Sequence, residues 1–208
     1  LLAWDLISGE LLVNNARQDG AYIFYSPDKN ELYTISQTGG VRVYDAEGGR
    51  LQTTFNGHPD FSGAGDYDDF YGWLALGGTD GSVKVWEPRD RASRVTISAH
   101  STPLTRIAFS PNGDLLATAA QDGPVRVWRW QDRTLVAELD AGGVSPLRLE
   151  FSPDGERLAL GMWDYIGMWR WDSAEFLYAL RTGPGGSSNV LAFSPDGRLL
   201  VNGGEIPD

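Results

Sequence analysis

The stretch FSPNG at residues 109–113 decides the fold, because close copies of it return along the chain at a constant step. FSPDG follows at 151–155 and again at 193–197, so successive copies are spaced 42 residues apart. A related stretch, YSPD at 25–28, lies two steps before the first copy. A repeat of about 40 residues indicates one supersecondary unit that buries its faces against neighbouring copies of itself.

A second marker keeps the same phase. It reads VRVY at 41–44, VKVW at 83–86, VRVW at 125–128 and IGMW at 166–169, with steps of 42, 42 and 41 residues. Such runs of β-branched and aromatic residues favour strands. Segments with helical periodicity are absent from the sequence, and 26 glycines and 11 prolines interrupt it often.

The repeat at 99–140 shows the content of one unit most clearly. A Ser-Pro-Asn-Gly turn at 110–113 and an Asp-Gly hairpin at 121–123 separate apolar segments. We therefore expect four strands, at Leu104–Phe109, Leu115–Ala120, Val125–Trp130 and Leu135–Leu139. Both faces of this antiparallel meander are apolar, which predicts an all-β fold of β-propeller blades.

These residues resemble the WD-repeat family of β-propellers over essentially the whole chain. The family's Gly-His pair is matched at 57–58 and, as Ala-His, at 99–100. Its turn aspartate is matched by Asp80, Asp122 and Asp164, and its tryptophan by Trp4, Trp86, Trp128 and Trp169, with Tyr44 once. At the motif's tryptophan position, the full Trp-Asp pair occurs only at 4–5. The resemblance implies a buried hydrogen-bond network of His100, Thr118, Asp122 and Trp128, which Leu76 would leave incomplete in the preceding repeat.

The repeat phase divides the chain into one propeller segment, 1–208, with four whole blades between two half blades. We predict half blades at 1–15 (third and fourth strands) and 183–208 (first and second strands), and blades at 16–56, 57–98, 99–140 and 141–182. The halves could pair and close a ring of five blades. Alternatively, the chain is a fragment of a larger propeller, which in the resembled family most often has seven blades. We favour the fragment.

The amino-acid composition limits the classes of partner and of chemical site that we expect for this chain. A net charge of −11 disfavours nucleic acid and anionic membranes, because both would repel an acidic surface. Cysteine is absent, which excludes disulfides and thiolate metal sites and leaves the compartment undetermined, with the cytoplasm weakly favoured. Signatures of phosphate-binding loops, nucleophile elbows and zinc sites are also absent, so we expect no enzyme and no cofactor.

The resemblance also implies that partners dock on the rim formed by the turn before the third strand and by the start of the first strand. The rim candidates are Trp163, Gln121, Thr79, Gln37, Thr105, Leu147 and Asn189. Trp163 is the leading one, because an exposed tryptophan is a typical hot-spot residue; its alternative role is packing against Tyr165.

Three further features could be functional or structural. An acidic stretch at 60–72 could hold Ca²⁺ through Asp66, Asp68 and Asp69, or it could be a degenerate turn. His58 and His100 occupy one repeat position, which favours a structural role. The motif WRW occurs at 128–130 and 169–171, and its repetition suggests packing at the outer edge with arginine stacked on the ring.

The sequence therefore predicts a non-catalytic scaffold that binds a protein or peptide partner. One alternative is a propeller that binds a metal or small ligand near 66–69. Others are a structural spacer, or part of a larger signalling enzyme whose catalytic domain lies outside these residues.

Overall fold

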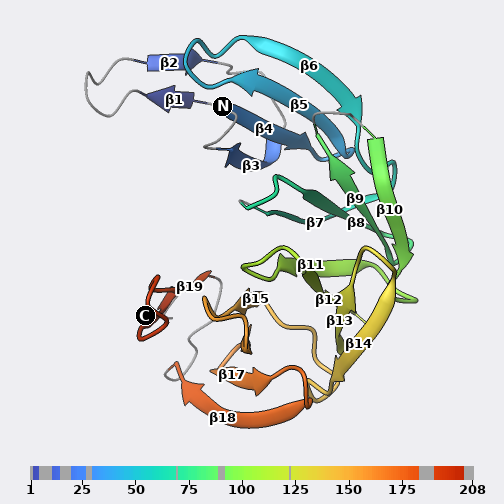
Figure 1. Ribbon diagram of the computed structural model, residues 1–208, viewed down its shortest axis with the longest axis vertical. Helices are drawn as coiled ribbons and strands as arrows, with labels where there is room; N and C mark the ends of the chain where they lie inside the picture. The colour runs from blue at the N-terminus through green and yellow to red at the C-terminus, as the bar shows by residue number, and fades with distance from the viewer. Residues whose placement is uncertain are drawn as a thin grey trace.

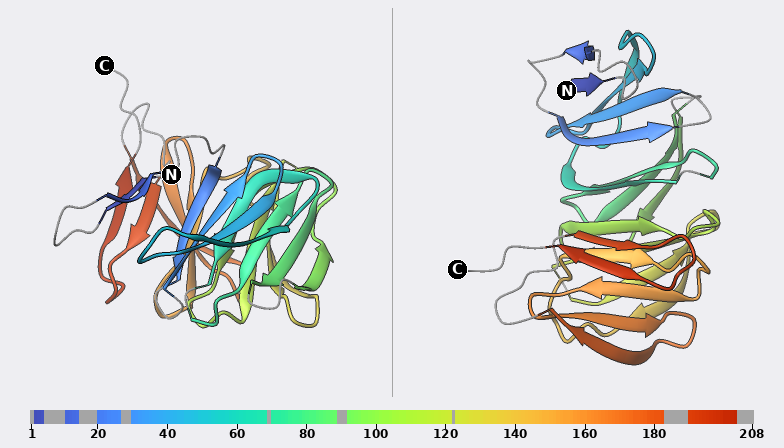
Figure 2. Two further views of the ribbon diagram at one scale, coloured as in Figure 1. Left: turned by 90° about the horizontal axis from the view of Figure 1, so that it is seen from above. Right: turned by 90° about the vertical axis from the view of Figure 1, so that its left-hand side faces the viewer.

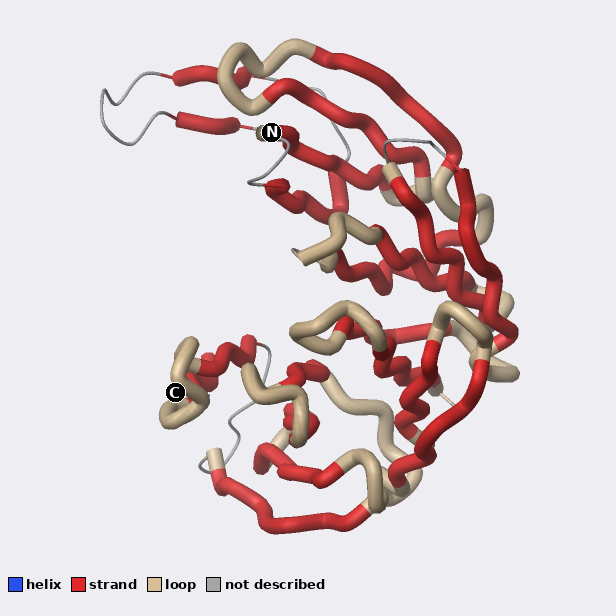
Figure 3. The backbone as a smooth tube through the Cα atoms, viewed as in Figure 1, coloured by secondary structure: helices blue, strands red, loops and turns tan. Residues whose placement is uncertain are grey.

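A computed structural model describes residues 2–4, 11–14, 20–26, 30–68, 70–88, 92–121, 123–182 and 190–203. Every regular element in these ranges is a strand (Figure 3). The strands form four sheets of four strands and two sheets of two strands, all antiparallel. Figure 1 shows the sheets side by side in an open arc. No helix in the described ranges has the length and apolar character that crossing a membrane requires.

Each four-stranded sheet is one blade, and its strands follow chain order. The first blade contains β3 (Gly20–Ser26), β4 (Glu31–Ser36), β5 (Gly40–Asp45) and β6 (Leu51–Asn56). The second contains β7 (Phe61–Tyr67), β8 (Leu74–Gly78), β9 (Ser82–Glu87) and β10 (Ala92–Ser98). The third contains β11 (Leu104–Phe109), β12 (Leu115–Ala120), β13 (Val125–Arg129) and β14 (Thr134–Leu139). The fourth contains β15 (Arg148–Phe151), β16 (Arg157–Gly161), β17 (Tyr165–Arg170) and β18 (Glu175–Arg181).

The first strand of each blade lies on the concave side of the arc and the fourth on the convex side (Figures 1 and 2). The two half blades are β1 (Leu2–Trp4) with β2 (Leu11–Asn14), and β19 (Val190–Phe193) with β20 (Leu200–Gly203). They stand at opposite ends of the arc as separate sheets, so the described strands do not form the closed ring of five blades. The larger ring stays a prediction.

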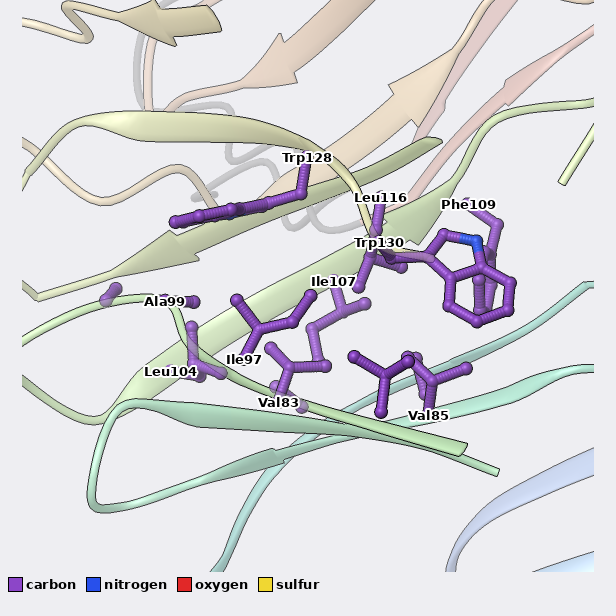
Figure 4. Packing of buried hydrophobic residues seen from close by; sticks show 14 residues of the cluster. Val83, Val85, Ile97, Ala99, Leu104, Ile107, Phe109, Leu116, Trp128 and Trp130 are labelled. Atoms are coloured by element: carbon purple, nitrogen blue, oxygen red, sulfur yellow. The ribbon is translucent and has the colours of Figure 1, made fainter. Parts of the chain in front are cut away.

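The core is a series of apolar layers between successive blades. The layer between the second and third blades buries Val83 and Val85 from one sheet against Ile107 and Leu116 from the other (Figure 4). Similar layers join the first blade to the second, the third to the fourth, and the fourth to β19 and β20. Each blade is therefore held mainly by its neighbours, as expected for a repeat array.

The Ser-Pro-X-Gly turns are built by one repeated set of hydrogen bonds. Ser110 Oγ donates to Asn112 Oδ1 at 2.7 Å and accepts from the backbone N–H of Leu115 at 2.9 Å. Gly113 closes the turn with a positive φ of 68°, a conformation that glycine adopts without strain. Ser152 and Ser194 make the equivalent bonds in the next two copies.

The WRW motif secures this turn to the third strand. Trp130 Nε1 donates to the Gly113 carbonyl at 2.8 Å, and Trp171 Nε1 donates to the Gly155 carbonyl at 2.7 Å. The structural reading of the motif is thus correct, but its cause is a hydrogen bond to the turn. The arginine between the tryptophans pairs with a carboxylate, for instance Arg170 with Glu175 at 2.6 Å. Trp130 follows the last residue of β13, so the predicted third strand was one residue too long.

Because Leu116 has no exposed surface in the layer between the second and third blades, Leu116→Ala should leave a cavity. We expect the free energy of unfolding to fall by about 2–4 kcal/mol in urea denaturation. The matched control is Leu199→Ala, at a leucine that is 66% exposed, where we expect a change within about 0.5 kcal/mol. Equal losses in the two variants would contradict the layered core.

Candidate partner-binding rim

Four hairpin tips project from one rim of the arc, one from each complete blade. Each connects the second strand to the third, and the residues at repeat-equivalent positions are Gln37, Thr79, Gln121 and Trp163, all exposed. In the second blade, Gly81 shapes the tip with a φ of +79° and donates to the Gly78 carbonyl at 3.2 Å. Because the blades stack side by side with their strands in the same order, these four tips lie at the same end of their blades.

Trp163 is the one large apolar residue among these four positions. Its hairpin is tight, because the Met162 N–H donates to the Tyr165 carbonyl at 2.9 Å. The indole is 61% exposed, while Tyr165 packs against the apolar layer between the third and fourth blades. The exposure leaves the indole accessible to a partner. Its role in binding stays a prediction.

Two of the other rim candidates contribute to contacts between blades. Thr105 Oγ1 lies 2.6 Å from Ser145 Oγ and also donates to the Ala119 carbonyl at 3.2 Å. The Leu147 carbonyl accepts a hydrogen bond from the Arg106 side chain. Thr105 and Leu147 therefore tie the third blade to the fourth beside the rim. The remaining candidate, Asn189, lies outside the described residues.

The structure brings together three of the four residues expected in the buried network of the third blade. His100 Nε2 lies 2.9 Å from Thr118 Oγ1, and Trp128 Nε1 donates to the same oxygen at 3.1 Å. Arg126 extends the network, because its Nη1 donates to the Ala99 carbonyl at 2.8 Å and lies 3.2 Å from His100 Nδ1. Asp122 lies outside the described residues.

The second blade builds a different network, because Leu76 cannot bond to its histidine. His58 Nε2 lies 3.0 Å from Ser82 Oγ, which in turn donates to Asp80 Oδ1 at 2.7 Å. Burial, with repulsion from Lys84, holds the pKa of His58 below its ordinary value, so the ring is neutral near pH 7. Trp86 Nε1 is buried and has no acceptor among the described residues. The hydroxyl that bonds to the histidine is therefore on the second strand in the third blade (Thr118) and on the third strand in the second blade (Ser82).

Ser82 was missed from the sequence, where the equivalent position in the third blade is Pro124. A signal was available, since a serine directly after the Asp80–Gly81 turn stands within reach of that aspartate. The hydrogen bond from Ser82 also helps to hold the pKa of Asp80 below its ordinary value, against the opposing effect of burial.

Ser82→Ala removes the hydroxyl that His58 and Asp80 share and should leave buried polar atoms unpaired. We expect the free energy of unfolding to fall by about 1–3 kcal/mol in urea denaturation. Ser93→Ala, at an exposed position in β10, is the control and should change it by less than about 0.5 kcal/mol. An unchanged Ser82→Ala variant would show that the network contributes nothing to stability.

The carboxylates of the acidic stretch bond to the backbone. Asp68 is buried and accepts from the N–H groups of Phe70 at 3.1 Å and Tyr71 at 2.9 Å, so it takes the place of serine in the turn. Asp66 Oδ2 accepts from the Phe109 N–H at 2.7 Å and so links the second and third blades. Asp69 lies outside the described residues, and within the described ranges no group of three metal-ligating side chains occurs.

A cavity of about 500 Å³ opens between the first strands of the second, third and fourth blades, and Asp66 and Glu150 both line it. Glu150 stands two repeats after Asp66, in the same phase. Burial raises the pKa of Glu150 from 4.5 to about 7. Sequence reasoning missed this residue, although an acidic residue in phase with Asp66 on an inner strand was visible.

The raised pKa predicts how stability depends on pH. Because the folded chain holds the Glu150 proton more tightly than the unfolded chain, the contribution of Glu150 to stability should be fully present below about pH 4.5 and be lost as the pH rises through 7. The free energy of unfolding should differ between pH 5 and pH 8, and Glu150→Gln should reduce that difference by about 2 kcal/mol. Urea denaturation of both proteins at these two pH values measures it, and identical pH profiles would contradict the assignment.

Comparison with known proteins gives one family and two relatives. The family model "WD domain, G-beta repeat" matches residues 49–87 and 92–129, which run from the fourth strand of one blade to the third strand of the next. A WD repeat-containing protein SL1-17 from Schistosoma mansoni is 29% identical over 120 residues, 57% of this chain and 40% of the relative. Eukaryotic translation initiation factor 3 subunit I from Eremothecium gossypii is 32% identical over 94 residues, 43% of this chain and 26% of the relative. Each match therefore covers less than half of the relative's length.

Proposed function

Because this chain belongs to the WD-repeat family, we propose that it is a non-catalytic scaffold that binds a protein or peptide on the rim carrying Trp163. WD repeats generally mediate protein interactions, and the proposal places that role on particular residues. The observation that carries it is the 61% exposure of Trp163 at the tip of a tight hairpin.

The rim has the physical character of a docking surface. Its tips are held by strands whose inward side chains are packed, so little conformational entropy is lost when a partner binds. Trp163 offers a large apolar anchor on the fourth blade, while Gln37, Thr79 and Gln121 offer polar groups on the other three. An aromatic anchor surrounded by hydrogen-bonding groups is the common composition of a binding hot spot.

The chemistry of the described side chains supports binding over catalysis. His58 and His100 are both buried in structural networks, which removes them from contact with a substrate. Asp66 and Asp68 accept backbone N–H groups. The rim residues Gln37, Thr79, Gln121 and Trp163 carry amide, hydroxyl and indole groups, which bind readily and seldom transfer protons.

Charge and similarity indicate the kind of partner. The net charge of −11 favours a basic protein or peptide and disfavours nucleic acid and anionic membranes. One relative is named as a subunit of a translation initiation factor, so it belongs to an assembly of proteins. This supports a protein partner for the present chain and does not identify it.

Selection of binders from a displayed peptide library tests the rim. We expect Trp163→Ala to weaken the selected peptides at least roughly tenfold in calorimetry, with unchanged thermal unfolding, because a hot-spot residue contributes about 2 kcal/mol or more.

Phe70→Ala is the matched control. Phe70 is also an exposed aromatic, at 66%, but the turn between β7 and β8 places it at the opposite end of the strands. The control should retain full affinity. If the peptides bind Trp163→Ala normally and lose affinity for Phe70→Ala, the docking surface lies on the opposite rim and the proposal is wrong.

A further inference from the structure

The fourth blade lacks a cationic side chain that the other three complete blades carry. At one position on the third strand the residues are Arg42, Lys84, Arg126 and, in the fourth blade, Gly167. The cross-strand pairing fixes this equivalence, because Arg126 lies opposite Thr118 and Gly167 lies opposite Leu160.

The third blade shows what this position normally holds. Arg126 sends Nη1 to the Ala99 carbonyl at 2.8 Å and Nε to Glu138 Oε2 at 2.8 Å, beside the ring of His100. One repeat later, Ala99 is matched by Ala141 and His100 by Gly142. The fourth blade therefore keeps, at Ala141, the backbone position that accepts from the guanidinium in the third blade. It lacks both large side chains, the arginine and the histidine, that fill the space there.

A pocket of about 220 Å³ stands in their place. Its wall includes the rings of Tyr165, Trp169 and Phe176, and the last two meet edge to face with centroids 5.1 Å apart. A Cβ built on Gly167 would lie 3.3 Å from Trp169 Nε1 and 3.5 Å from carbons of Tyr165 and Phe176. A Cβ built on Gly142 would meet nothing within 4 Å. The three rings thus meet at Gly167, the position equivalent to Arg126 in the third blade. Beyond the rings, toward Gly142, the pocket is open.

The remaining groups in the pocket favour a cation. Asp140 contributes a carboxylate and Ala141 stands where the carbonyl of Ala99 accepts from Arg126. Aromatic rings attract guanidinium groups through their faces, and planar guanidinium stacks on them readily. The overall charge of −11 adds a long-range attraction for basic ligands.

We propose that this pocket binds the guanidinium of an arginine side chain from a partner, in the place that Arg126 occupies within the third blade. The arginine enters between Gly142 and Gly167, packs against the three rings and donates to Asp140 and to the backbone. This site adds to the rim and does not depend on it, although Met162 lines the pocket and adjoins Trp163.

The test uses N-acetyl-arginine methylamide as the probe and the citrulline analogue, which has the same shape without the charge, as its control. Calorimetric titration should show at least roughly tenfold tighter binding of the arginine compound, because only its hydrogen bonds are charge-assisted. Trp163→Ala should leave this binding unchanged, so a failure of the rim proposal and a failure of this one give different results.

Gly167→Arg should abolish binding, because it returns to the pocket the side chain that Arg126 supplies in the third blade. Gly167 does not have a positive φ, so the backbone permits the substitution. Should this variant not fold, Asp140→Asn, at an exposed position, should weaken arginine binding several-fold and leave citrulline binding unchanged. Equal binding of the two compounds, no binding of either, or full arginine binding by a folded Gly167→Arg variant would overturn the proposal.

Discussion

The structure depends on one constraint: each blade has two apolar faces, and only another blade can cover them. Val83 and Val85 are buried because Ile107 and Leu116 lie against them, and the same relation recurs at the other two boundaries between complete blades. The polar ties follow the same geometry, since Asp66 reaches the Phe109 N–H and Thr105 reaches Ser145 across these boundaries.

Much of the fold could be predicted from the sequence, because short-range hydrogen bonds and turn residues determine where the strands begin and end. The limits of β11 and β12 agree with the prediction because Ser110, Gly113 and the Asp-Gly hairpin determine where the chain turns. The end of β13 was missed, because the position of Trp130 depends on a hydrogen bond to Gly113, seventeen residues earlier. Ring closure could not be predicted, since the angle between blades depends on how side chains of two sheets pack together.

The candidate sites were less predictable for the same physical reason. Repeat phase identified His100, Thr118 and Trp128, because equivalent positions have equivalent neighbours. It failed for Ser82, which supplies the hydroxyl from a different strand. The pocket at Gly167 required two losses at distant positions to be seen in space, namely the large side chains of the arginine and the histidine that the third blade carries there. A departure from the repeat is therefore more informative about this chain than agreement with it.

The tryptophan that bonds to its own turn also bears on how the chain folds. Trp130 and Trp171 each close a loop of about 16 residues, and the polar ties between blades span only about 40 residues. Contacts of such short range carry a small loop-closure entropy, so a blade can form soon after its residues become available. Folding can then proceed in the order of synthesis, with each finished blade serving as the template on which the next one assembles.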